Sequence, residues 1–354
     1  MQGIDSRAQF PSHSEGSADM IGPIIETEHL TKMYGPHVAL DEMSLKINSG
    51  ATGLLGPNGA GKSTLIKTLL GLIQLTSGEG KVLGYDIRTQ GDSIRQRIGY
   101  MPEYDCLTLE MDAVHQVKYC GELIGMNTNI AMQRAHEVLE YVGLRDQRYR
   151  EISTFSTGMM QATKLACAII HDPDLLICDE PTNGLDAKSR GFMLDTLFQV
   201  VKQGERSILM SSHLMEDVER ICDRIVMIHK GKLIAQGKIE DLKAIDREIE
   251  IWVWGGASRM EGALQNAGLS PRRTGRVMRV VRQDETTYDL VLELAAKIGV
   301  QIRRMEDYEP SLEDLFLVIM ERLGYGVKSS ADLLNTQAQP RSVAPSPSRP
   351  GGEF

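Results

Sequence analysis

The stretch from Gly56 to Ser63, GPNGAGKS, has residue types that can bind the phosphates of a nucleotide. It fits the spacing G-x-x-x-x-G-K-S, in which glycines allow backbone N–H groups to turn toward a phosphate. We expect Lys62 to reach the β- and γ-phosphate oxygens, and the hydroxyl of Ser63 to bind Mg²⁺. A Gly-rich turn without a ligand is the alternative, but an apolar run before the loop and a helical pattern after it favour phosphate binding. The predicted phosphate-binding loop comprises Gly56, Pro57, Asn58, Gly59, Ala60, Gly61, Lys62, Ser63 and Thr64.

Two carboxylates follow the apolar run LLIC at residues 175–178. Ligands of open α/β sheets bind beyond the carboxyl ends of the strands, so we expect both side chains near the phosphates. Asp179 would hold Mg²⁺ through the water shell of the metal, and Glu180 would polarise the water that attacks the γ-phosphate. An Asp-Glu pair alone is more often only the end of a strand, and it is the loop at residues 56–64 that favours catalysis.

His213 follows another apolar run, SILMSS at residues 207–212, and would lie at the same edge of the sheet. We expect its imidazole to contact the γ-phosphate. A structural histidine at the end of a strand is the alternative.

A second candidate phosphate site lies at Ser156, Thr157 and Gly158, which lead directly into a helix with an apolar stripe. The N-terminus of a helix binds anions through its free N–H groups and its dipole. The chain therefore contains two predicted phosphate sites, about a hundred residues apart in sequence.

The elements that must position these residues alternate between short apolar strands and helices, which predicts a mostly parallel sheet with helices packed on it. This α/β region extends from residue 24 to about residue 243 and contains a helical subdomain at about 102–170. A small α/β accessory domain is predicted at 247–324, and its last helix begins with a capping box at Ser311 and Asp314. We expect a disordered leader at 1–22 and a disordered Pro/Ser-rich tail at 326–354.

Composition excludes several classes of protein. The chain has 354 residues and a formal net charge of −9, which argues against broad nucleic-acid binding. Its five cysteines lie far apart without a CxxC pair, which indicates reduced thiols, not a disulfide framework or a zinc site. No run of about 18 apolar residues is present, so the sequence predicts no membrane span.

Taken together, these motifs resemble the ATP-binding subunits of ABC transporters. The resemblance covers roughly residues 24–240 and depends on five motifs in register: the loop at 56–64, Ser156–Gly158, the strand ending in Asp179 and Glu180, Asp186, and His213. It implies a P-loop NTPase fold of the ABC type that binds ATP and Mg²⁺. It also implies a homodimer, or a pair with a sister subunit, in which the signature helix that Ser156 begins faces the γ-phosphate held by the other subunit.

The resemblance also implies roles for single residues. Tyr34 would stack on adenine, for which a strand-end core Tyr is the alternative, and Asp186 would bridge the two subunits. Glu103 stands where the family usually has Gln, and it would sense Mg²⁺ and contact the membrane partner. The signature reads Ser156-Thr157-Gly158-Met159 in place of the common Ser-Gly-Gly-Gln, and it keeps Ser156 and Gly158, which approach phosphate most closely.

The hypothesis is therefore an ATPase subunit at the cytoplasmic face of the membrane that drives transport through separate integral-membrane permease subunits. The C-terminal domain resembles that of exporter ATPases and favours export. Two alternatives are a soluble ABC-type ATPase that acts on nucleic acid or ribosomes, and a regulator that binds ATP without hydrolysing it. The first would be supported by paired nucleotide domains, a long coiled coil or CxxC modules, none of which the sequence contains. The second is supported only by the altered signature and Glu103.

Overall fold

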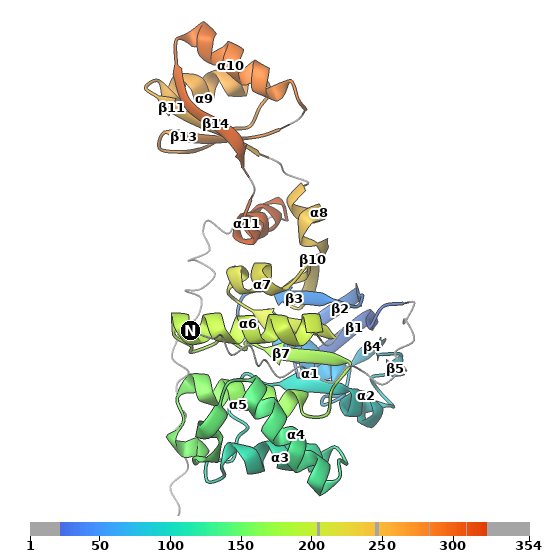
Figure 1. The fold of residues 1–354 in the computed structure, drawn as a ribbon. Helices are drawn as coiled ribbons and strands as arrows, with labels where there is room; N and C mark the ends of the chain where they lie inside the picture. Colours follow the sequence, from blue (N-terminus) through green and yellow to red (C-terminus); the bar gives the residue numbers. More distant parts are fainter. Residues whose placement is uncertain (1–21, 204–205, 245–247, 283, 309, 324–354) are drawn as a thin grey trace, which may run out of the picture.

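The computed structural model describes residues 22–203, 206–244, 248–282, 284–308 and 310–323 (Figure 1). The predicted tail at 326–354, and the predicted leader apart from Gly22, lie outside these ranges. The described residues form a large unit up to residue 244, a small unit from 248 to 308, and a final helix.

A six-stranded sheet in the order β10-β9-β3-β8-β7-β6 forms the centre of the large unit. Its strands from β9 to β6 are parallel, and β10 pairs antiparallel with β9. Successive residues such as Leu54 and Leu55 enter different apolar clusters, one on each face of the sheet. Burial on both faces explains why these strands are continuous apolar runs. The bounds are β3 (Ala51–Leu55), β6 (Ile98–Met101), β7 (Leu175–Asp179), β8 (Ser207–Ser212), β9 (Arg224–His229) and β10 (Lys232–Lys238).

An antiparallel sheet in the order β2-β1-β4-β5 packs on one side of this centre. Helix α1 carries Leu65 and Ile66 into the same apolar cluster as Ile25 of the antiparallel sheet and Leu54 of the central one. It therefore packs against both sheets, directly after the predicted phosphate loop. The elements here are β1 (Ile25–Tyr34), β2 (His37–Ile47), α1 (Lys62–Leu69), β4 (Ser77–Val82), β5 (Tyr85–Asp86) and α2 (Gly91–Arg97).

The segment in which we predicted a helical subdomain forms helices between β6 and β7 (Figure 1). Asp112 begins α3 as its N-cap, because its side chain accepts a hydrogen bond from the backbone N–H of His115. The elements are α3 (Ala113–Leu123), α4 (Thr128–Tyr141), 3-10 helices at Arg145–Tyr149 and Ile152–Thr154, and α5 (Thr157–Ile169). Three further helices of the large unit are α6 (Ala187–Gln203), α7 (Met215–Ile221) and α8 (Ile239–Ala244). The predicted α/β fold class is confirmed.

The small unit is a four-stranded antiparallel sheet in the order β12-β13-β11-β14. Two helices, α9 and α10, cover one face of it, and Met260 and Val291 of these helices join Ile249 and Ile251 of the sheet in a separate apolar cluster. Its elements are β11 (Glu248–Trp254), α9 (Ala257–Asn266), β12 (Arg272–Thr274), β13 (Val277–Val281), α10 (Thr287–Ile298) and β14 (Gln301–Tyr308).

The final helix, α11 (Leu312–Arg322), differs from the expectation that it packs within the small unit. Four of its buried residues belong to the apolar cluster of the large unit, where it contacts α7 and α8 (Figure 1). The predicted capping box is present, since the backbone N–H of Asp314 donates to Ser311 Oγ and the backbone N–H of Ser311 donates to Asp314 Oδ2. An apolar stripe predicts that one side of a helix is covered, but it does not say by which unit. The side chains that pack on the large unit are Leu312, Leu315, Phe316 and Met320.

Replacing Phe316 with alanine is expected to lower the free energy of unfolding of the large unit by about 3–5 kcal/mol, since this ring is 1% exposed in its core. Scanning calorimetry measures this effect on the transition that added ATP raises, which reports the nucleotide-binding unit. Leu323→Ala is the control, because Leu323 is 51% exposed and should cost less than about 0.5 kcal/mol. An unchanged transition for Phe316→Ala would contradict the packing of α11 on the large unit.

Candidate functional site

The loop between β3 and α1 has a backbone that requires glycine at two positions. Gly61 has a φ of 108°, and a Cβ there would lie 2.7 Å from the carbonyl oxygen of Ala39. A Cβ at Gly56 would lie 2.4 Å from the carbonyl oxygen of Ile228. The backbone therefore passes too close to two other segments for any side chain at these points.

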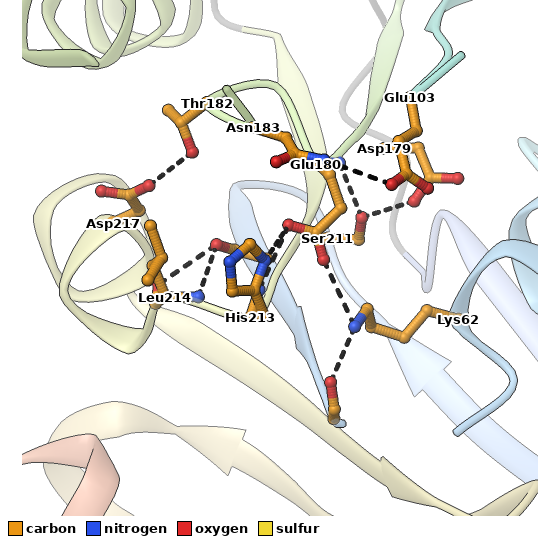
Figure 2. A network of polar contacts seen from close by, with 12 residues as sticks. Lys62, Glu103, Asp179, Glu180, Thr182, Asn183, Ser211, His213, Leu214 and Asp217 are labelled. Atoms are coloured by element: carbon orange, nitrogen blue, oxygen red, sulfur yellow. Dashed lines mark hydrogen bonds and ion pairs between the residues drawn. The ribbon is translucent and has the colours of Figure 1, made fainter. Parts of the chain in front are cut away.

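Glu180, directly after β7, connects this loop with the segment after β8 (Figure 2). Its Oε1 lies 3.3 Å from Lys62 Nζ, and its Oε2 lies 2.7 Å from Nδ1 of His213. Lys62 Nζ also donates a hydrogen bond of 2.7 Å to the carbonyl oxygen of Gly56. The three residues predicted to be catalytic thus come from separate segments, and Glu180 contacts both of the others.

The backbone of Glu180 is strained. Its φ is 52°, in the left-handed region, which costs a residue other than glycine about 1–3 kcal/mol. The side chain is nevertheless held in place, because it is 5% exposed and its backbone N–H donates to Ser211 Oγ at 2.9 Å. Strain retained at a buried carboxylate is typical of a functional position.

The hydrogen bond between Glu180 and His213 favours the charged form of both side chains. Burial raises the pKa of Glu180, but the hydrogen bond from His213 and the charge of Lys62 outweigh it, so the pKa is below its ordinary value. The hydrogen bond to Glu180 raises the pKa of His213, against the opposing effect of burial. Glu180 is therefore ionised at neutral pH and can accept a hydrogen bond from water.

Ser211 connects the two adjacent carboxylates. Its Oγ donates to Asp179 Oδ1 at 2.6 Å while it accepts the backbone N–H of Glu180. Asp179 is 2% exposed, so this hydroxyl orients a buried carboxylate beside the cavity described below. No sequence pattern indicated this role for Ser211, which lies within an apolar strand.

Replacing Ser211 with alanine is expected to lower the free energy of unfolding by about 1–3 kcal/mol, because a buried carboxylate oxygen loses its hydrogen-bond donor. Urea denaturation checks the size of the loss. Ser153→Ala is the matched control at an exposed position and should change stability by less than about 0.5 kcal/mol. Equal stabilities of the two variants would show that the Ser211 hydroxyl does not support Asp179.

A cavity of about 610 Å³ opens along the loop. It is large enough for a nucleotide, and Lys62 is the ammonium group on its wall. Gly56, Ala60, Asp179, Ser156, Gly158 and Asp186 are not among its lining residues. The predicted site residues that line it are Tyr34, Pro57, Asn58, Gly59, Gly61, Lys62, Ser63, Thr64, Glu103, Glu180 and His213.

The oxygen atoms at this cavity fit Mg²⁺. Ser63 and Glu103 line it, and Mg²⁺ prefers a few oxygen ligands together with the phosphates of a substrate. Oε1 of Glu180 is buried and, apart from Lys62, has no hydrogen-bond partner among the described residues. No group of three or more His, Cys, Asp or Glu side chains in the described chain could hold a metal alone, so phosphate oxygens would have to complete the shell.

Tyr34 lies at the end of β1, on the wall of the cavity, and is 48% exposed. Lys32 Nζ lies 4.8 Å from the centre of its ring, on which it makes a cation–π contact. Its half-exposed position on the wall of the cavity disfavours the alternative of a core tyrosine.

Ser156 begins α5 as its N-cap, with its Oγ accepting the backbone N–H of Met159 at 3.3 Å. The side chain is exposed and lies outside the lining of the cavity beside Lys62. Asp186 caps α6 in the same way, because its Oδ1 accepts the N–H groups of Lys188 and Ser189. The structure thus separates Ser156 from the loop of its own chain.

Glu103 is tied to two other elements. Its Oε1 accepts a hydrogen bond of 3.3 Å from Asn183 Nδ2, and its carbonyl oxygen accepts one of 3.0 Å from Lys164 Nζ. Lys164 is 2% exposed and belongs to α5, the helix that Ser156 begins. Sequence reasoning missed both partners, although a lysine within an apolar helical stripe is a signal for Lys164.

A buried network behind Glu180 was also missed. Thr182 Oγ1 donates to Asp217 Oδ2 at 2.6 Å (Figure 2), and Arg190 Nε donates to Asp217 Oδ1 at 2.6 Å. These residues come from the loop after β7, from α6 and from α7. Each is an ordinary polar residue in sequence, so only their contact reveals the network.

The glycine loop, the strand-end carboxylates and the parallel sheet together define a P-loop ATPase. A family model described as "ABC transporter" matches residues 40–183. The chain belongs to the ABC transporter family, as an ATP-binding subunit. No described helix has both the length and the apolar character that a membrane span requires.

Relatives and solved structures agree with this assignment. The chain is 34% identical to the Nod factor export ATP-binding protein I of Cupriavidus metallidurans, over 84% of this chain and 98% of that protein. It is 40% identical to the linearmycin resistance ATP-binding protein LnrL of Bacillus subtilis, over 62% of this chain and 70% of the relative. A solved ATP-binding subunit of an ABC transporter matches 63% of this chain and 92% of its own, with a TM-score of 0.57 and 28% identity.

Proposed function

We propose that this ATPase hydrolyses ATP in the cavity beside Lys62, with Glu180 as the base that orients the attacking water. The observation that carries the proposal is the contact of one strained, buried carboxylate with both Lys62 and His213. Lys62 is paired with Glu180, and a γ-phosphate would compete for its ammonium group. Release of Oε1 from Lys62 would leave this atom free to accept a hydrogen bond from water.

The other residues of the site would bind ATP and Mg²⁺ and orient them. Tyr34 would stack on the adenine, the N–H groups of residues 56–64 would hold the phosphates, and His213 would contact the γ-phosphate. Ser63, Glu103 and Asp179 would hold Mg²⁺, which when bound neutralises charge on the phosphate oxygens. Ser211 would keep Asp179 oriented toward that position.

The exposed helix start at Ser156 would bind the nucleotide of a second subunit. The exposure of Ser156 and Thr157, outside the cavity of their own chain, supports this reading, because the start of a helix attracts anions. Gly158 would let the backbone approach the γ-phosphate of the partner, and Asp186 would lie at the same interface. ATP between the two subunits would then stabilise the dimer.

We further propose that ATP-driven closure moves a substrate outward through separate integral-membrane permease subunits, with this chain at the cytoplasmic face of the membrane. Relatives named for Nod factor export and for linearmycin resistance favour export. In the source cells, Glu180→Gln at the native locus should reduce tolerance to at least one compound of a broad panel of growth inhibitors. Unchanged growth across a broad inhibitor panel would count against export.

Phosphate release by the purified chain tests the site itself. ATP turnover should need Mg²⁺, stop on addition of EDTA, and be absent in Lys62→Ala, which lacks the ammonium group for the phosphates. Lys188→Ala, also a lysine but exposed at the start of α6, is the control and should retain wild-type turnover. Turnover that persists in EDTA would contradict the role of Ser63, Glu103 and Asp179.

A further inference from the structure

Helix α11 follows β14 and lies between the small unit and the large unit, where it packs against α7 and α8 (Figure 1). It contacts α7, which begins two residues after His213. Its side chains Leu312 and Phe316 are 0% and 1% exposed. The chain thus returns to the nucleotide-binding unit after it has formed the small unit.

One carboxylate, that of Glu219, binds the start of α11 to the large unit. Oε1 of Glu219, on α7, accepts a hydrogen bond of 2.9 Å from the backbone N–H of Leu312, the first residue of α11. The same oxygen lies 2.8 Å from Nζ of Lys243, on α8. Glu219 therefore joins three helices that are far apart in the sequence.

Helix α11 and the His213 segment line one open cavity. A cavity of about 280 Å³ has Leu312 and Phe316 on one side, and Leu214 and Met215, the two residues after His213, on another. Pro57 of the phosphate loop also lines it. His213 itself also lines this cavity, so α11 and the His213 segment are neighbours, and a displacement of α11 would remove one wall beside that segment.

The other side of the start of α11 is bound to the small unit. Asp314 Oδ2 accepts a hydrogen bond of 2.6 Å from Tyr308 Oη, at the end of β14. Oδ1 of the same carboxylate lies 3.9 Å from Nη1 of Arg279, on β13. A shift of the small sheet would therefore be passed to α11.

We propose that Glu219 is a positioning residue for ATP turnover. By holding α11 against α7, it keeps His213 in contact with Glu180. The small unit influences the rate of ATP turnover through its contacts with α11. The inference rests on the proposed role of Glu180. The hydrogen bond and the ion pair of Glu219 go to Leu312 and Lys243 and not to the phosphate loop or Tyr34, so its loss should lower kcat and leave KM for ATP unchanged.

The test compares Glu219→Ala with two matched variants. Glu219→Ala removes the acceptor for Leu312 and should lower kcat about tenfold, since small losses of orientation slow a reaction strongly. KM should stay within about twofold. Glu219→Gln keeps an Oε1 acceptor, and Lys243→Met removes only the ion pair, so both should stay within about twofold of the wild-type kcat.

Tyr308→Phe tests whether the small unit acts on α11, and it changes no residue of the large unit. Loss of its hydrogen bond to Asp314 should lower kcat about two- to threefold, again at constant KM. This variant also covers the case in which Glu219→Ala does not fold. Melting temperature and ATP affinity are measured for every variant.

Two results would overturn the inference: a wild-type kcat in both Glu219→Ala and Tyr308→Phe, or a Glu219→Gln as slow as Glu219→Ala. Failure of the proposed function looks different, because Glu180→Gln would then turn over ATP at the wild-type rate. A slow Glu180→Gln with a fast Glu219→Ala would reject this inference alone.

Discussion

Glu180→Gln is expected to lower the rate of ATP turnover by about two to four orders of magnitude while ATP still binds. Glutamine keeps the size of the side chain, but it cannot accept a proton. It also lacks the negative charge that the Glu180 carboxylate places beside Lys62 and His213. The hydrogen bonds of the Glu180 backbone to Ser211 stay in place, so the strand end should keep its shape. Phosphate release under steady-state conditions measures the rate, and binding of a fluorescent ATP analogue measures affinity.

The matched control is Glu216→Gln, which removes a carboxylate two residues into α7, near His213 in sequence. Its side chain is 87% exposed and pairs with Arg190, so turnover should stay within about twofold of wild type. If Glu180→Gln retains more than about a tenth of wild-type turnover, another group activates the water and the assignment of the base is wrong.

Ser156→Arg is expected to abolish dimerisation driven by ATP. In the Glu180→Gln background, Mg-ATP should double the mass in solution, because nucleotide that is not hydrolysed stays between two subunits. The arginine would place a bulky side chain where the exposed start of α5 meets the γ-phosphate of the partner, and the hydroxyl that caps the helix would be lost. Light scattering after size-exclusion chromatography measures the mass.

Binding of ATP to the monomer should survive this change, since Ser156 does not line the cavity beside Lys62. Ser153→Arg, an exposed site in the preceding 3-10 helix, is the control and should still dimerise. A Ser156→Arg variant that doubles its mass with ATP would reject the two-subunit site. Glu180→Gln that binds ATP but stays monomeric would instead point to a sister subunit as the partner.

Most of the candidate site could be predicted because its chemistry lies in short contiguous stretches. The glycine spacing of the loop, the apolar runs that end in Asp179, Glu180 and His213, and the capping box at the last helix are all local patterns. They depend on the backbone of a few residues, so the sequence carries them without knowledge of the fold. The α/β fold class follows in the same way from the alternation of strands and helices.

The partners of these residues could not be predicted. Ser211, Asn183, Lys164 and the Thr182–Asp217–Arg190 network are ordinary polar residues whose roles come from contacts between distant segments. These residues do not recur at helix or strand spacing in the sequence. The order of the strands in the parallel sheet decides which of their segments meet.

The sequence alone determined that this chain is an α/β protein that binds ATP, and it predicted two separate phosphate-binding helix starts and an accessory α/β unit. Only the tertiary structure decided that Glu180 contacts both Lys62 and His213 and that Ser156 lies outside the cavity which these three residues line. It also decided that α11 packs on the large unit beside His213. The physical reason is that glycine loops, caps and apolar periods act over a few residues, whereas ion pairs and helix packing depend on which surfaces the folded chain brings together.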